Sequence, residues 1–544
     1  MPQWFFPEQR KSDVRRDPIE SEYFKHDQEN EADYDGVDNL VREVLQNSLD
    51  AAVDTNSPIR VRFAIYDHSK MPNKERLQVY FDRLKAPMQV CDSSFDFENA
   101  TEGFLVCEDF GTRGLEGDVG LSSDPKTSEP RQDFFWFWRN VARSAKSEGT
   151  LGRWGIGKAV YHRASRIGCF LGLTVRQSDV PKTYLMGQAI LKIHEHNGKE
   201  YIADGFWGDN DSGMILPVTD KKIIEQFRRE WDISRHSEPG LSVIVPFVDS
   251  GLNKTNILQA VAVHFFEKIL QGLLIVEIET PNPNDNVILA SDSIAILCKE
   301  IQWDGNKKFK RHTSPPIAFI AECLACKRRP LESKLLGVEK IPGLTKETFD
   351  EDSLNTAREQ FESGYLVAVK IRLQFSKKNG RYFTDIQDTF DVFVQKTDDK
   401  TPDSYFVREG MTIPKPNSSK AKQNGVRGYV RIQKNPDSSG SLASLLGDAE
   451  GPAHEDWNTS EKRIQQNWKT GAKGRIEFIK KIVDSVYSVL NPPLGQADSQ
   501  FLSGYFSIPE HSGTIRSRKD TTLPIPVIIN ESPKWYRVDK RPCG

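Results

Sequence analysis

Apolar residues recur at helical spacing between Leu40 and Ala52. At about 100° per residue, they share one face of a helix, and polar residues form a stripe within roughly 40° on the other face. The apolar face contains Val37, Val41, Val44, Leu45, Leu49 and Ala52, and the stripe contains Glu43, Asn47, Asp50 and Asp54. The segment is therefore predicted to be an amphipathic helix. A helix face exposed to solvent would show the same polar stripe, so this helix by itself does not indicate a function.

Other segments alternate between apolar and polar residues, as strands do. We expect strands at Ile59–Tyr66, Phe104–Cys107, Gly168–Val175, Tyr184–Ile193, Leu241–Phe247 and Leu273–Glu279, and helices at Ile156–Arg163, Asn253–Leu270 and within Ser460–Leu490. Tyr365–Phe375 and Tyr382–Val394 are expected to pair as a hairpin with its tip at residues 376–381, because Asn-Gly tolerates positive φ. This mixture predicts an α+β fold whose first sheet is mostly antiparallel, with helices over one face.

Changes in composition divide the chain into four parts. Residues 1–36 are a strongly acidic arm, and residues 37–250 form a first domain that contains the amphipathic helix. Residues 251–500 form a second α/β domain, and residues 501–544 are a basic tail. A chain of 544 residues is too long for a single core, so at least two domains are expected.

Composition also excludes some classes of protein. No run of about 18 apolar residues occurs, so no membrane partner is expected, and the first residues lack the pattern of a signal peptide. Seven scattered cysteines fit a reducing compartment, so a cytoplasmic location is expected. Only Cys323 and Cys326 have metal-ligand spacing, and no second pair accompanies them. The net charge of −3 implies no partner by itself.

Two glycine-bearing segments follow the helix along the chain. The first is Asp109-Phe110-Gly111, and the second spans Gly152–Lys158. Each alone is more often a turn than a ligand site. Together, Glu-x-x-x-Asn-x-x-Asp-Ala at residues 43–51, Asp-x-Gly and Gly-x-x-Gly-x-Gly resemble the nucleotide site of the GHKL ATPases. That superfamily contains gyrase B, MutL, the microrchidia proteins and the ninety-kilodalton heat-shock chaperone. The resemblance implies a Bergerat-type α/β sandwich over residues 37–250, followed by a transducer-like domain.

The resemblance implies ATP and Mg²⁺ as cofactors and gives roles to the matching residues. Glu43 would orient and deprotonate the attacking water, and Asn47 would bind Mg²⁺ through its carbonyl oxygen. Asp50 and Ala51 belong to the same motif and are expected to bind the nucleotide. Asp109 would accept a hydrogen bond from the adenine amino group, because an ionised carboxylate is only an acceptor.

The second glycine segment is the expected phosphate cradle. Gly152, Gly155 and Gly157 leave backbone N–H groups free to face phosphate oxygens, and Ile156 begins a helix whose positive end adds to them. Lys158 would supply a point charge at that turn.

Gly111 would let the backbone pass close to the base. Two further positions are weaker nucleotide-binding candidates. Gly114 is separated from Gly111 by two residues, where the family has one. Ser242 lies in Pro239–Val243, where the family usually has Gly-Thr. A plain strand start is an equally good interpretation of that stretch.

Residues 115–149 are interpreted as a lid, because they are polar and lie between two ligand motifs. Five successive aromatic residues, Phe134–Trp138, cannot all face one side of a helix, so some are expected to pack on a partner or on a mobile cover. In the resembled branch, a second domain supplies a cation to the γ-phosphate. Lys377 and Lys378 are the first catalytic candidates for this role and Arg408 is the next, with a solvated turn as the alternative for the lysine pair.

The leading interpretation is an ATPase that forms a homodimer when ATP binds. Its output would be nucleic-acid handling or anti-phage defence, with DNA or another nucleic acid as partner. The basic stretches Lys307–Arg311, Lys327–Arg329 and Arg516–Lys519 favour this output, although such stretches are usually solvated surface. Two alternatives stay open: a chaperone-like ATPase acting on a protein partner, and a non-catalytic scaffold that ATP switches.

Overall fold

The computed structural model describes most of the chain. The described residues are 2–9, 36–125, 131–139, 159–178, 183–211, 213–303, 313–337, 342–398, 403–413, 419–434, 441–451 and 456–492. Most of the acidic arm, the segment Gly152–Lys158 and the tail 501–544 lie outside them. The predicted domain boundaries therefore stay predictions at both ends of the chain.

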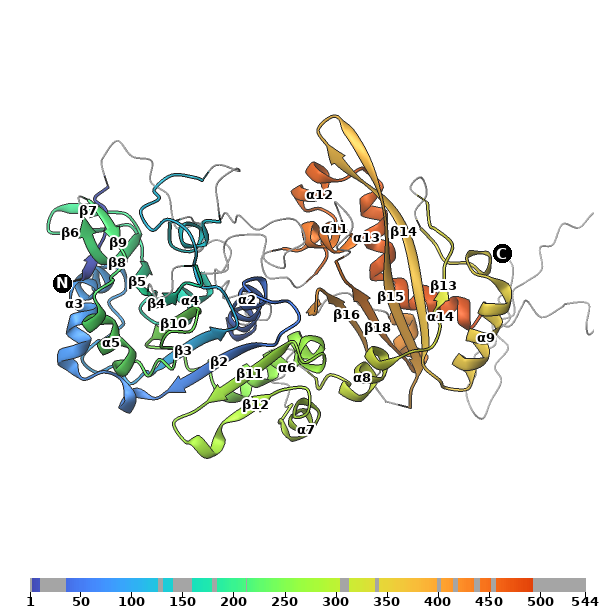
Figure 1. The fold of residues 1–544 in the computed structure, drawn as a ribbon, viewed down its shortest axis with the longest axis horizontal. Helices are drawn as coiled ribbons and strands as arrows, with labels where there is room; N and C mark the ends of the chain where they lie inside the picture. The colour runs from blue at the N-terminus through green and yellow to red at the C-terminus, as the bar shows by residue number, and fades with distance from the viewer. Residues whose placement is uncertain are drawn as a thin grey trace, which may run out of the picture. The chain divides into compact units, whose positions relative to one another are not determined.

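The first half of the chain builds a ten-stranded sheet (Figure 1). Its order is β1-β8-β5-β4-β10-β3-β2-β11-β12, with β9 paired to β8, and only the β2–β11 pair is parallel. The strands are β1 (Gln3–Phe5), β2 (Ile59–Tyr66), β3 (Phe104–Phe110), β4 (Cys169–Val175), β5 (Thr183–Ile190), β8 (Asp204–Asp211), β9 (Met214–Leu216), β10 (Gly240–Pro246), β11 (Leu274–Glu279) and β12 (Val287–Leu289), and β6 (His194–His196) and β7 (Lys199–Tyr201) form a separate pair. The predicted α+β fold with a mostly antiparallel sheet is confirmed.

Helices cover this sheet on both faces. Every residue of β3 is buried, and since successive side chains of a strand point to opposite faces, both faces must be covered. Leu105 packs in the cluster that contains Val44, and Val106 packs in the cluster that contains Phe81. The first face carries α2 (Gly36–Asp50), α4 (Ala159–Ala164) and α6 (Lys254–Leu270), and the second carries α3 (Lys74–Cys91) and α5 (Lys221–Glu230). The sequence predicted helices over one face of this sheet, and the second helical layer corrects that part of the prediction.

The second half builds a six-stranded sheet of order β13-β14-β15-β18-β16-β17. Its strands are β13 (Leu331–Glu332), β14 (Val367–Asn379), β15 (Tyr382–Lys396), β16 (Ser404–Arg408), β17 (Met411–Ile413) and β18 (Val426–Ile432). The helices of this half are α7 (Ile294–Glu300), α8 (Ile317–Ala325), α9 (Glu351–Glu362), α10 (Ser419–Gln423), α11 (Leu442–Ala449), α12 (Lys462–Asn467), α13 (Ala472–Lys480) and α14 (Ile482–Leu490). The expected hairpin is β14–β15. Among the described helices, none is long and apolar enough to cross a membrane.

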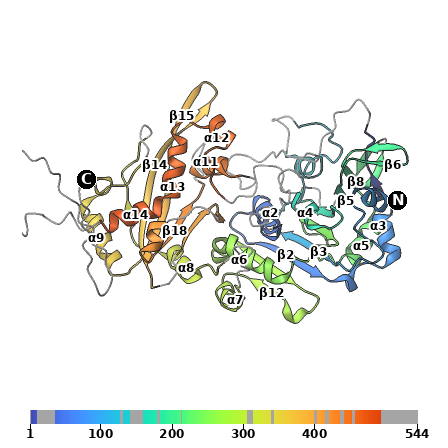
Figure 2. The ribbon, with the colours of Figure 1, turned by 180° about the vertical axis from the view of Figure 1, so that it is seen from behind.

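Helix α6 contacts elements of both halves, as expected for the helix predicted at Asn253–Leu270. It lies beside α2 in both ribbon views, and His264 Nε2 is 3.2 Å from Asp38 Oδ2 of that helix (Figure 2). One turn later, the buried Glu267 accepts hydrogen bonds from Tyr429 of β18 and from Gln433, the latter at 2.9 Å. The helix that follows the first domain is thus bonded to the second sheet.

Candidate active site

Helix α2 presents the predicted polar stripe. Glu43, Asn47 and Asp50 are half-buried, whereas Leu45, on the other side of the helix, is fully buried. The helix ends where the N–H of Ala51 donates to Asn47 O at 3.0 Å. The structure therefore confirms the amphipathic helix and places the carboxylate and the carboxamide one turn apart.

The loop after α2 pairs with the loop after β3. The N–H of Val53 donates to Gly111 O at 3.0 Å, and the N–H of Arg113 donates to Ala51 O at 3.2 Å. These two bonds join segments that are about sixty residues apart in the sequence. As a result, the end of α2 and the Asp109 motif form one site.

Asp109 is buried at the end of β3, and its two carboxylate oxygens differ in their contacts. Oδ1 accepts from the hydroxyl of Thr112 at 2.7 Å and from the N–H of Leu241 at 2.7 Å. Oδ2 has a single longer contact among the described residues, to the hydroxyl of Ser48 on α2 at 3.3 Å. A carboxylate oxygen has two lone pairs, so Oδ2 retains capacity to accept from a ligand amino group.

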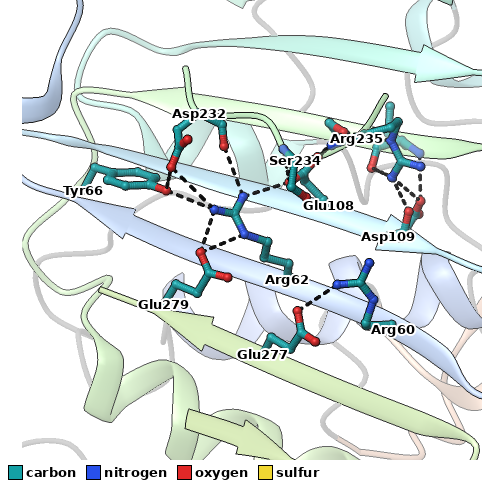
Figure 3. A network of polar contacts seen from close by, with 12 residues as sticks. Arg60, Arg62, Tyr66, Glu108, Asp109, Asp232, Ser234, Arg235, Glu277 and Glu279 are labelled. Atoms are coloured by element: carbon teal, nitrogen blue, oxygen red, sulfur yellow. Dashed lines mark hydrogen bonds and ion pairs between the residues drawn. The ribbon is translucent and has the colours of Figure 1, made fainter. Parts of the chain in front are cut away.

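Arg235, which the sequence interpretation missed, holds the backbone beside this carboxylate (Figure 3). Its side chain is fully buried and donates to the carbonyl oxygens of Asp109, Glu238, Pro239 and Leu241. Its Nη2 lies 3.5 Å from Asp109 Oδ1, and burial lowers the pKa of the guanidinium. No local motif marks Arg235, and its proximity to the Pro-Gly turn is the only sequence signal.

Glycines allow the backbone segments around Asp109 to approach one another closely. Gly240 has a φ of +143°, and a Cβ there would lie 2.5 Å from Asp109 O and 2.7 Å from Asp109 Oδ1. Gly114 has a φ of +74°, and a Cβ there would meet Val175 O and lie 2.9 Å from Thr174 Oγ1. Gly111 also has a positive φ, +82°. Gly114 is thus needed for packing, although its spacing departs from the family pattern.

Ser242 contacts the neighbour of Asp109 rather than Asp109 itself. It pairs with Glu108 across β10 and β3, so it lies on the face of the sheet opposite to Asp109. Its hydroxyl donates to Glu108 Oε1 at 2.8 Å and accepts from Arg235 Nε at 2.9 Å. Ser242 therefore supports the network around Arg235. Its predicted role in nucleotide binding remains a prediction.

Glu108 is the centre of a buried ionic network beneath the site (Figure 3). It accepts from Arg62 at 2.8 Å and from the hydroxyl of Ser234 at 2.7 Å. Burial would raise the pKa of this carboxyl, but the Ser234 hydrogen bond and the Arg62 charge outweigh it, and the pKa is lowered. Arg62 also pairs with Glu279 of β11 at 2.6 Å. The network fixes β3, and with it Asp109, between β2 and β10.

Tyr161 of α4 packs in the buried cluster that also contains Val44 of α2. Burial raises the pKa of its phenol well above the usual value, and Cys107 and the negative charges of Asp109 and Glu43 add to the shift. Tyr161 is therefore a core residue beneath the helix that carries Glu43 and Asn47.

The aromatic cluster of the predicted lid is anchored on the sheet. Phe134, Phe135 and Trp138 are buried, and Trp138 stacks on Phe170 of β4 with ring centroids 5.2 Å apart. Phe134 lies edge-on to Tyr184 of β5 at 6.3 Å. The sequence led us to expect that some of these rings pack on a partner or on a mobile cover. These three rings are instead buried within the chain itself. Lid closure over residues 115–149 stays a prediction.

The second-domain lysines are not at the hairpin tip. Strand β14 continues to Asn379, so the turn is only Gly380-Arg381, and Lys377 and Lys378 pair with β15. The Nζ of Lys378 donates to Gln465 O. The placement of the lysine pair at the tip was therefore wrong, because the ladder extends past Phe375. A role for either lysine at a γ-phosphate remains untested.

Arg408 lies at the end of β16 in a fully buried ion pair. Its Nη2 is 2.5 Å from Glu450 Oε2, and its Nε donates to the other oxygen of the same carboxylate. Its Nη1 has no hydrogen-bond partner among the described residues. Burial acts to lower the pKa of the guanidinium, but Glu450 and, to a smaller extent, the charge of Asp50 raise it, and the pKa is raised. Arg408 thus ends a strand, as expected from the sequence, but its side chain lies in the core, and its role at a γ-phosphate remains a prediction.

The site offers oxygen ligands for a cation and a carboxylate for a base. Among the described residues, no group of three or more His, Cys, Asp or Glu side chains has the geometry of a metal site. Mg²⁺ requires fewer protein ligands, because it keeps several waters and uses phosphate oxygens. Asn47 with Glu43 one turn before it fits such a partial site. The phosphate cradle predicted at Gly152–Lys158 lies outside the described residues.

Comparisons with known proteins give structural matches only. No protein-family model matches the chain, and a search of curated proteins finds no match. One similar solved structure is the 43K ATPase domain of Thermus thermophilus gyrase B in complex with an aminocoumarin, at 10% identity and a TM-score of 0.30, over 86% of this chain and 95% of that one. Another is the B subunit of the DNA gyrase from Myxococcus xanthus, at 8% identity and a TM-score of 0.30, over 83% and 86%. Both are gyrase B proteins, the branch that the motifs resemble, but at these values the likeness assigns no activity to this chain.

Proposed function

We propose that this chain binds ATP with Mg²⁺ and hydrolyses it. The observation that carries the proposal is Asp109, whose Oδ1 is held by Thr112 and Leu241 while Oδ2 keeps acceptor capacity. An acceptor fixed in a buried place suits the amino group of adenine. Glu43 and Asn47 lie on the helix whose end is bonded to the same loop.

Each residue has one part in this reaction. Glu43 orients the attacking water and takes its proton. Asn47 would hold Mg²⁺, which would supply positive charge to the phosphates. Gly152–Lys158 would supply backbone donors and a lysine to the triphosphate, as the family resemblance implies. A cation from the second domain, with Lys377, Lys378 and Arg408 as candidates, would stabilise the charge that develops at the γ-phosphate.

The proposal is tested by separating binding from turnover. Glu43→Ala should keep ATP affinity and lose roughly 10²- to 10⁴-fold in kcat, since it removes only the base. Asn47→Ala should instead weaken Mg-ATP binding. Glu75→Ala, an exposed glutamate in the first turn of α3, is the matched control and should change neither quantity. Equal turnover by wild type and Glu43→Ala would contradict the assignment.

The finer proposal is a nucleotide-gated homodimer that handles nucleic acid or acts in anti-phage defence. It rests on the family resemblance and on Lys327–Arg329, the only one of the three basic stretches within the described residues. Stimulation of the ATPase by double-stranded DNA would favour this output over a chaperone-like ATPase. A wild-type protein that binds ATP without turnover would favour the non-catalytic scaffold. Sedimentation with a non-hydrolysable analogue tests the dimer, and a persistent monomer would exclude it.

A further inference from the structure

The β14–β15 hairpin extends beyond the rest of its sheet. Strand β18 pairs only with residues Asp391–Lys396 of β15, so the half from Tyr382 to Phe390 has β14 as its one strand neighbour among the described residues. Figure 1 shows this end of the hairpin projecting past the other strands of the sheet. The projecting end closes through Gly380-Arg381.

Two aromatic rings are exposed at this end. Tyr382 is 80% exposed and Phe383 is 50% exposed, and Tyr382 is the most exposed large apolar residue in the described part of the chain. As neighbours on a strand, they point to opposite faces of the hairpin. Burying such a ring normally removes 150–250 Å² from water, so its exposure on both faces needs an explanation.

The surroundings of these rings are strongly basic. The N–H of Lys469 donates to Ser376 O at 3.0 Å, and Lys377 forms a β-bridge with Trp468, so residues 461–474 run beside residues 376–385. Together these two segments contain seven Lys or Arg and two Asp or Glu, whereas the whole chain contains 74 and 77. The Nζ of Lys469 lies 5.7 Å from the ring centroid of Phe383. We call residues 376–385 and 461–474 the hairpin surface.

We propose that the hairpin surface binds single-stranded nucleic acid. Exposed aromatic rings stack on unpaired bases of any sequence, and the lysines and arginines contact the phosphates. A duplex offers its bases to such rings only after costly unstacking, so a single strand fits better. An acidic protein would match the charge but would not account for a ring on each face. The proposal deepens the nucleic-acid part of the proposed function.

The experiment measures binding of labelled oligonucleotides of about 20 nucleotides, longer than typical single-strand sites. Single-stranded DNA, single-stranded RNA and duplex DNA are compared by fluorescence anisotropy, without ATP, so that a failure of ATP hydrolysis does not affect the result. Tyr382→Ala with Phe383→Ala should weaken single-strand binding by roughly 5- to 100-fold. Arg381→Glu should also reduce the dependence of affinity on salt, because it removes a phosphate contact.

The matched control is Tyr365→Ala. Tyr365 is 56% exposed in the same half of the chain, but Arg328 covers its ring at 5.3 Å, and it lies outside the hairpin surface. This variant should bind like wild type. If Phe383→Ala disturbs folding, the affinity of Tyr382→Ala alone decides the comparison. Equal affinity of wild type and the Tyr382 and Phe383 variants, or a preference for duplex, would overturn the proposal.

Discussion

Arg235 and Arg408 are both fully buried, and they are held in opposite ways. Arg235, at the first sheet, donates to four carbonyl oxygens and to the hydroxyl of Ser242. Arg408, at the second sheet, donates to both oxygens of Glu450, which also accepts from Trp457 at 3.0 Å. The hydrogen bonds of Arg235 thus go to neutral oxygens, with the Asp109 carboxylate 3.5 Å away, whereas Arg408 is hydrogen-bonded directly to a carboxylate.

The pKa values of the two guanidinium groups are shifted in opposite directions, as their partners would predict. Burial lowers the pKa of Arg235, and nearby carboxylates offset this only in part. Burial acts to lower the pKa of Arg408 as well, but the charge of Glu450 outweighs it, and the pKa is raised. Arg235 therefore shapes a site in which Asp109 keeps acceptor capacity, while Arg408 stabilises the core around it.

The largest expected effect on stability comes from breaking the ion pair between Arg408 and Glu450. Glu450→Gln should lower the free energy of unfolding by about 3–5 kcal/mol, because it leaves a charged arginine buried without a counter-charge. The double variant Arg408→Met with Glu450→Gln should regain most of this, since it removes the charge and keeps an acceptor for Trp457. Urea denaturation followed by tryptophan fluorescence measures both. A loss below about 1 kcal/mol would show that the pair is not the support of this core.

An intermediate loss of stability is expected from a substitution at Gly240, which lies against Arg235 and Asp109. Gly240→Ala should cost roughly 1–3 kcal/mol and also weaken nucleotide binding, because the new methyl group would displace Asp109 and Arg235. Gly272→Ala is the control: its φ is +70° but no atom lies within 4 Å of an added Cβ, so only the backbone cost of about 1–2 kcal/mol applies. Both are measured by urea denaturation and by ATP titration. Unchanged nucleotide affinity in Gly240→Ala would separate this glycine from the site.

The smallest effect concerns Ser242 and acid stability. Ser242→Ala removes one donor to Glu108 and should cost about 1 kcal/mol at neutral pH. The folded-state pKa of Glu108 is lowered, so its contribution is present above the unfolded pKa and is lost as pH falls through the folded value. Losing a donor raises the folded pKa, so acid unfolding should begin at a higher pH.

Ser94→Ala is the control for this prediction, since its hydroxyl donates to Asp92 at 2.6 Å on the exposed surface. Unfolding free energies measured across the acid range should separate the two variants. If both shift the acid transition equally, the burial of Glu108 has no special effect on stability.

Part of this protein could be predicted from single segments of the sequence. The helix Gly36–Asp50, the strand Phe104–Phe110 that carries Asp109 and the hairpin β14–β15 follow from periodicity and turn residues, which act within one element. The order of the motifs then indicated which face of α2 belongs to the site. These features are local, so the sequence alone was enough to predict them.

Tertiary structure decided the rest. Arg235 reaches Asp109 across 126 residues, and Glu108 meets Ser242 across 134, with no local pattern to announce either contact. Phe134, Phe135 and Trp138 became core, and Arg408 was buried, because strands and helices from distant segments cover them. A buried polar group must find partners wherever the fold provides them, and that choice depends on the packed chain rather than on the neighbouring sequence.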